Sequence, residues 1–145
     1  MGSLNPPSSG AVYFDTNVFI YSVEKVEPQS SALRPIWLAA RAGAIEIVSS
    51  ELVVLETLVK PFRDRDILLE NVYRALLFDS RDVRLLPVSV AILERAARIR
   101  AETGLKTPDS IHAATALDVR AALFVTNDAQ VRRVGGLSVA ILTEV

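Results

Sequence analysis

Four acidic residues stand at positions where a carboxylate can do more than keep a protein in solution. Asp15 ends the apolar run AVYFD, and Asp128 ends the run ALFVTND. Asp109 lies near the start of a predicted helix, TPDSIHAATALDVRA, and Glu56 lies inside another, SELVVLETLVKP. The four carboxylates come from segments far apart in the chain, so the fold decides whether they meet.

A group of carboxylates in one cleft favours a bound cation. Two unit charges about 4 Å apart repel by roughly 4 kcal/mol at an effective dielectric constant near 20. Such a cluster therefore either takes up protons or holds a positive ion. With oxygen ligands, no cysteine and His112 as the only histidine, the expected ion is Mg²⁺ or Mn²⁺. An ion of this kind can orient a water molecule and neutralise charge on a phosphate, which is the chemistry of phosphodiester hydrolysis.

Each acid also has a plain structural interpretation. Asp15 and Asp128 can cap the helices that follow them, and Asp109 is favoured by the helix dipole. Glu56 can pair with Lys60 four residues later. This last interpretation is the weakest, because the helical neighbours of Glu56 at −4, −3 and +3 are apolar, and a carboxylate there needs compensation.

The order of the predicted elements determines where these acids fall. Strands are expected at residues 11–15, 44–50, 83–89, 122–128 and 137–144. A turn or short helix is expected at 16–23, and helices at 31–43, 50–61, 66–80, 90–104, 107–121 and 129–134. This alternation predicts an α/β fold, a parallel sheet of about five strands with helices on both faces. Ligands bind beyond the carboxyl ends of such strands, where Asp15 and Asp128 lie.

Length and composition limit the domain organisation. A chain of 145 residues is large enough for one domain with a proper core. We expect residues 1–10, rich in proline and serine, to form a disordered lead and residues 11–145 to form the domain. Half of the residues are hydrophobic and the mean hydropathy is +0.32. Either both faces of the sheet are buried, or some apolar surface is kept for a partner.

Several classes of protein are excluded by the residues present. Without cysteine there is no disulfide framework, zinc-thiolate site or thiol nucleophile. No apolar run reaches the length of a membrane span, and the start lacks the pattern of a signal peptide. A cytoplasmic protein is therefore expected. The formal net charge of −1 is not that of a bulk nucleic-acid binder, so contacts with phosphates require a local patch.

The segments FDTNVFIY, SSELVVLE, TPDSIHAATAL and FVTND together resemble, in order, the four acidic blocks of PIN-domain ribonucleases. Single-domain proteins of this length are most similar to the VapC-type toxins of toxin–antitoxin pairs, and the resemblance spans about residues 11–142. It implies a PIN-like sheet and a metal-dependent endoribonuclease that hydrolyses RNA. Asp15 and Asp109 would be the surest ligands of the Mg²⁺ or Mn²⁺ ion. Glu56 and Asp128 would complete the site or orient the attacking water.

The resemblance also implies supporting residues. Thr16, Asn17 and Thr126 would supply hydrogen bonds around the acids. Three further residues are selected by their position alone. Runs of charge are usually solvated faces, but Arg132 and Arg133, just past the last acid, are candidates for contacts with RNA phosphates. A lone histidine is more often a packed or surface residue than a ligand, although His112, one helical turn after Asp109, invites a supporting role.

Partners follow from the same resemblance. A small antitoxin protein would dock an amphipathic segment over the acidic cleft, and a homodimer is expected. The apolar helix at 50–61 could be the docking groove or dimer face, or simply a buried helix. The chain departs from the family pattern after the last acid, where DAQVRRV has no aromatic residue, and in its longer start.

Two other functions stay open. A non-catalytic PIN-like module that binds RNA or protein would keep the fold without the chemistry, although no acid is missing here. A nuclease of the same kind could also process RNA without being a toxin. A phosphatase of the haloacid dehalogenase type is not favoured, because it needs a second aspartate two residues after the first, where this chain has Asn17.

Overall fold

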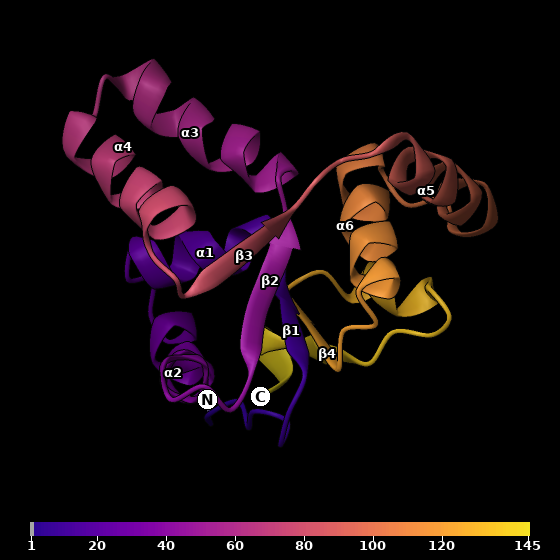
Figure 1. The fold of residues 1–145 in the computed structure, drawn as a ribbon, viewed down its shortest axis with the longest axis horizontal. Coiled ribbons are helices and arrows are strands. Elements are labelled where there is room, and N and C mark those ends of the chain that lie inside the picture. The colour runs from indigo at the N-terminus through magenta and orange to yellow at the C-terminus, as the bar shows by residue number, and fades with distance from the viewer. Residues whose placement is uncertain (1) are drawn as a thin grey trace.

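The computed structural model describes residues 2–145, and one parallel sheet forms the centre of the domain (Figure 1). The strands are β1 (Ala11–Phe14), β2 (Glu46–Ser50), β3 (Val83–Leu86), β4 (Leu123–Thr126) and β5 (Val139–Ile141). They lie in the order β3-β2-β1-β4-β5, and every neighbouring pair is parallel. The predicted α/β class and the five-stranded sheet are confirmed.

Helices cover both faces of the sheet. They are α1 (Thr16–Val23), α2 (Gln29–Arg41), α3 (Leu52–Asp64), α4 (Ile67–Arg74), α5 (Val90–Thr103) and α6 (Thr107–Asp118), with short turns η1 (Ala75–Asp79), η2 (Ala129–Arg133) and η3 (Leu142–Glu144). Figure 1 shows α1 to α4 on one side of the sheet and α5 and α6 on the other.

The alternation of side chains along the strands produces two cores. Val12 and Phe14 of β1 pack with α1 and α2, whereas Tyr13 points to the opposite face and packs with Val48 and Phe124. All five side chains are fully or almost fully buried. Because successive residues of a strand face opposite sides, a sheet covered on both faces needs strands that are apolar throughout. The high hydropathy of the chain is partly explained by this.

Two helix boundaries differ from the sequence prediction. The helix predicted to end at Pro61 continues to Asp64, and Arg65 ends it in a left-handed conformation with φ 52°. An internal proline removes one backbone hydrogen bond, and here it does not end the helix. The predicted helix at 66–80 is an α-helix only to Arg74, after which η1 forms a wider π-type turn.

The first residues contact the domain without forming a helix or strand. The Gly2 amide donates to the Val145 carbonyl at 3.2 Å, and the Leu4 amide donates to the Ala32 carbonyl at 3.0 Å. The Leu4 side chain is buried in the core with α2. The sequence predicted a disordered lead over residues 1–10; these contacts attach residues 2–4 to the domain, and Met1 lies outside the described residues.

Within residues 2–145, none of the helices has both the length and the apolar character needed to cross a lipid bilayer.

Candidate active site

Asp15 lies at the carboxyl end of β1 and begins α1. Its Oδ1 accepts a hydrogen bond from the Asn17 amide at 3.1 Å, so the helix-capping interpretation is correct. The Thr126 hydroxyl at the end of β4 donates to Oδ2 of the same carboxylate. These two contacts fix the Asp15 carboxylate at the point where the adjacent strands β1 and β4 end. A carboxylate that caps a helix can still bind a cation.

Three of the four acids, Asp15 among them, line one cavity. A polar cavity of about 160 Å³ is lined by Asp15, Thr16, Asn17, Ile20, Glu56, Asp109 and His112. Glu56 enters from the second turn of α3, and Asp109 from the first turn of α6. The cavity has room for an ion together with some of its water ligands. The fold thus brings together three of the four acids that the sequence selected.

Burial and repulsion between the acids raise the pKa values of two of these carboxylates, Asp15 and Asp109. Burial raises the pKa of Asp15, although the hydrogen bond from Thr126 partly opposes this. Burial also raises the pKa of Asp109, and the negative charge of Asp128 raises it further. A bound cation would relieve both effects, because it favours the ionised form of each carboxylate.

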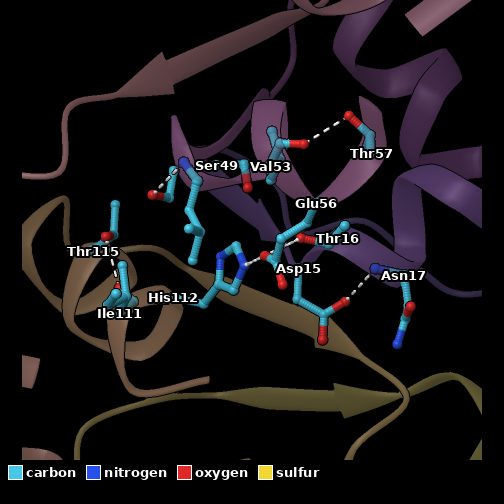
Figure 2. A network of polar contacts seen from close by, with 12 residues as sticks. Asp15, Thr16, Asn17, Ser49, Val53, Glu56, Thr57, Ile111, His112 and Thr115 are labelled. Carbon is cyan, nitrogen blue, oxygen red and sulfur yellow. Dashed lines mark hydrogen bonds and ion pairs between the residues drawn. The ribbon is translucent and has the colours of Figure 1, made fainter. Parts of the chain in front are cut away.

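Glu56 is different because donors hold it in the charged form. Burial alone would raise the pKa of Glu56, but hydrogen bonds from His112 and Thr16 outweigh this and lower it. The Thr16 hydroxyl donates to Oε1 at 2.7 Å, and Nε2 of His112 lies 2.9 Å from the same oxygen. Figure 2 shows the imidazole reaching toward both residues beside Asp15. The alternative pairing of Glu56 with Lys60 is wrong, since Lys60 Nζ binds Glu24 Oε1 at 2.7 Å.

Asp128 stands next to this group without lining the cavity. It follows β4, and its Oδ1 accepts from the Gln130 amide at 3.0 Å, so it caps η2 as the structural interpretation expected. Its amide donates to the Thr126 hydroxyl oxygen at 3.0 Å. Its charge nevertheless acts on the pKa of Asp109. The Thr16 and Thr126 hydroxyls and the Asn17 backbone amide all donate hydrogen bonds to these acids, and a supporting role in a reaction stays a prediction.

The two arginines past Asp128 are already engaged. Both Nη atoms of Arg132 donate to the Glu144 carboxylate, with Nη1–Oε1 at 3.0 Å. Arg133 Nη1 donates to the Thr103 carbonyl at 3.3 Å. Exposed contacts contribute little because solvent screens them, so they do not prevent an exchange for phosphate. Contact with RNA stays a prediction for both.

The donors suit a hard divalent ion. Asp15 and Asp109 offer carboxylate oxygens at one cavity, the ligands that Mg²⁺ and Mn²⁺ prefer. Across residues 2–145, however, no three acidic, histidine or cysteine side chains are close enough together to form a ready-made metal cluster. Chelation of one ion by all four acids therefore stays a prediction.

A parallel sheet with carboxylates gathered at its carboxyl edge defines an α/β domain with an acidic cavity at the strand ends. The family model of the PIN domain matches residues 12–137, and the chain therefore belongs to the PIN domain family. No match is found among curated protein sequences.

Several solved structures share this fold. The VapBC2 structure from Rickettsia felis, bound to a promoter DNA fragment, contains a chain that is 17% identical with a TM-score of 0.71; the match covers 90% of this chain and 98% of that one. A toxin–antitoxin complex from Klebsiella pneumoniae gives 23% identity and a TM-score of 0.65, with 90% and 97% covered. FitAcB from Neisseria gonorrhoeae contains a chain that is 19% identical with a TM-score of 0.66; the match covers 92% of this chain and 99% of that one. At these identities the likeness establishes the fold.

Proposed function

We propose that this PIN domain is a Mg²⁺- or Mn²⁺-dependent endoribonuclease that hydrolyses RNA phosphodiester bonds in the cytoplasm. The observation that carries the proposal is the meeting of Asp15, Glu56 and Asp109, from three separate segments, in one polar cavity. The raised pKa values of Asp15 and Asp109 support a site that is completed by a cation.

Asp15 and Asp109 would hold the ion, and Glu56 and Asp128 would complete the site or orient the attacking water. When bound, a divalent ion supplies an activated water and neutralises charge on the phosphate. The chain's own contribution is to fix the carboxylates. Thr126 and the Asn17 amide hold Asp15, and Thr16 with His112 holds Glu56 in its ionised form.

The proposal is tested by incubating the purified chain with a mixture of RNAs in Mn²⁺, in Mg²⁺ or in excess chelator. We expect new internal RNA ends only when the ion is present. A module that only binds RNA would retain the RNA in a filter assay and produce no new ends. Cleavage that is indifferent to the chelator would contradict metal dependence.

A basic hollow lies beside Arg133 and supports a path for the RNA backbone. It has a volume of about 380 Å³ and is lined by Arg95 and Arg98 of α5 as well as Arg133. Arginines of this kind position a phosphate backbone without reading the bases. They provide the local positive patch that the overall charge of −1 requires.

We further propose that the protein is the toxin of a toxin–antitoxin pair, in which a small antitoxin covers one groove. Solved structures with this fold are described as complexes of toxins with antitoxins. A groove of about 400 Å³ runs between α1, α2 and α4, with Lys25, Arg34 and Arg41 around Trp37 and Val72. Its mixture of basic and apolar residues suits an amphipathic segment with acidic residues.

The groove continues into an exposed apolar surface on α3 and α4. The exposed apolar side chains there are Leu55, Val59, Phe62, Ile67, Leu68 and Val72. A monomer rarely leaves so much apolar surface in contact with water. The interpretation of residues 50–61 as an ordinary buried helix therefore does not account for this face, and we propose that protein partners, antitoxin or second copy, use it.

Substitution of Val72, which lines the groove, by glutamate tests whether the antitoxin binds there. Val72 is 49% exposed, so the substitution leaves the core intact, but it puts a negative charge where an acidic segment is expected. We expect affinity for the proposed antitoxin to fall about tenfold or more, a loss of about 1.4 kcal/mol. RNA cleavage without antitoxin should be unchanged, and titration calorimetry measures the affinity.

Val90→Glu is the matched control, because Val90 is 74% exposed on α5, across the sheet from the groove. If both variants bind the antitoxin as tightly as the unmodified chain does, the antitoxin does not bind in the groove between α1, α2 and α4.

A further inference from the structure

A buried chain of hydrogen bonds runs from the core to the cavity through the only histidine. The His112 side chain is 3% exposed, and Tyr13 behind it is fully buried. The Tyr13 hydroxyl lies 2.6 Å from Nδ1 of His112. On the other side of the ring, Nε2 lies 2.9 Å from Oε1 of Glu56 and 3.2 Å from the Thr16 hydroxyl oxygen.

The donors and acceptors in this chain fix which ring nitrogen of His112 donates toward the cavity. The ionised Glu56 carboxylate can only accept, and the single hydroxyl proton of Thr16 is used in its bond to Glu56. Nε2 must therefore carry the proton that points toward both oxygens. On the other side of the ring, Nδ1 is paired with the Tyr13 hydroxyl. Burial raises the pKa of Tyr13, so its hydroxyl keeps its own proton.

From this geometry we propose that Tyr13 and His112 are positioning residues that fix the Glu56 carboxylate at the cavity through an imidazole whose Nε2–H donates to Oε1. Oε1 of Glu56 is occupied by two hydrogen bonds, from His112 and Thr16. The other oxygen, Oε2, would then be the one that binds an ion or its water. The proposal rests on the proposed function for its catalytic meaning, but the hydrogen-bonded chain itself can be tested separately.

The absence of any other histidine makes the test direct. With histidine labelled by ¹⁵N, the full chain has one ring to observe by NMR, and the two nitrogen shifts report which one carries the proton. We expect a proton on Nε2 that is hydrogen-bonded to Glu56. Tyr13→Phe removes only the hydroxyl and should shift the Nδ1 signal away from its hydrogen-bonded position. A ring whose Nε2 carries no proton, or a spectrum unchanged in Tyr13→Phe, would overturn the proposal.

The consequence for the site is measured as Mn²⁺ affinity by calorimetry or electron paramagnetic resonance. Residues that orient a metal ligand typically contribute 10–100-fold in affinity or activity. We expect losses of about this size in His112→Ala, and a smaller loss in His112→Gln, whose amide can still donate toward Glu56. Tyr13→Phe should fall between the unmodified chain and His112→Ala. Affinities equal to that of the unmodified chain in all three variants would contradict a positioning role.

Tyr73→Phe is the matched control for Tyr13→Phe. Tyr73 is also buried, and its hydroxyl donates to a glutamate, Glu24 Oε2, at 2.7 Å, but neither residue lines the acidic cavity. Its loss should lower stability without changing Mn²⁺ affinity or the His112 spectrum. If the unmodified chain binds no Mn²⁺, the proposed function fails, and the ¹⁵N spectrum still decides whether the hydrogen-bonded chain exists.

Discussion

Asp15→Asn is expected to lower the rate of Mn²⁺-dependent RNA cleavage by about 10²–10³-fold, the range found when one preorganised electrostatic contact to a transition state is removed. The substitution keeps an oxygen that can accept from the Asn17 amide, so the start of α1 stays capped. The substitution removes the negative charge that the Thr126 hydroxyl contacts, at the ends of β1 and β4. The measurement is single-turnover cleavage of a defined RNA under saturating ion.

Asp66→Asn provides the control for loss of a capping aspartate. Asp66 caps α4 with its Oδ1, which accepts from the Leu69 amide at 3.0 Å, and it does not line the acidic cavity. Its cleavage rate should stay close to that of the unmodified chain. If Asp15→Asn cleaves RNA as fast as Asp66→Asn, the cavity is not the site of catalysis.

Asp109→Asn is expected to stabilise the metal-free protein at neutral pH while removing most of its stabilisation by Mn²⁺. Burial and the charge of Asp128 raise the pKa of Asp109 above its ordinary value of 3.8. The folded state therefore binds this proton more tightly than the unfolded state does. The corresponding stability is fully present below the ordinary pKa and is lost as the pH rises through the folded-state pKa. An amide carries no such penalty.

Thermal unfolding in chelator at several pH values measures this effect. At pH 7 we expect Asp109→Asn to unfold at a higher temperature than the unmodified chain, because the raised pKa of Asp109 makes its ionised form destabilising. The difference should shrink as the pH falls toward 4. With Mn²⁺ at a hundred times its dissociation constant, the unmodified chain should gain about 2.7 kcal/mol, and the variant much less. Equal gains in both proteins would show that Asp109 does not hold the ion.

Much of the fold and most of the site could be predicted from the sequence because the signals are local. Apolar runs that end in Asp15 and Asp128 identify the strands and their carboxyl ends. Parallel strands meet at the same edge, so the rule for ligand sites in such sheets already places these two residues near each other. The family resemblance supplied the roles, and the PIN domain match confirms the family.

What the sequence could not show depends on contacts between distant residues. His112 lies 99 positions from Tyr13 and 56 from Glu56, and only the placement of α6 on the face of the sheet that Tyr13 shares brings the three together. Its spacing of three residues from Asp109 was a signal for a shared helix face, but nothing in the sequence indicated the tyrosine behind it. The pairing of Lys60 with Glu24 was hidden in the same way, since local spacing favoured Glu56.

The most direct test of a divalent ion held between the end of β1 and the start of α6 is anomalous diffraction from crystals of the chain soaked in Mn²⁺. An anomalous peak within coordination distance of both Asp15 and Asp109 is the predicted result. Mn²⁺ bound only outside the cavity would contradict a metal site there. So would a cavity without Mn²⁺ in crystals of a protein that cleaves RNA in solution.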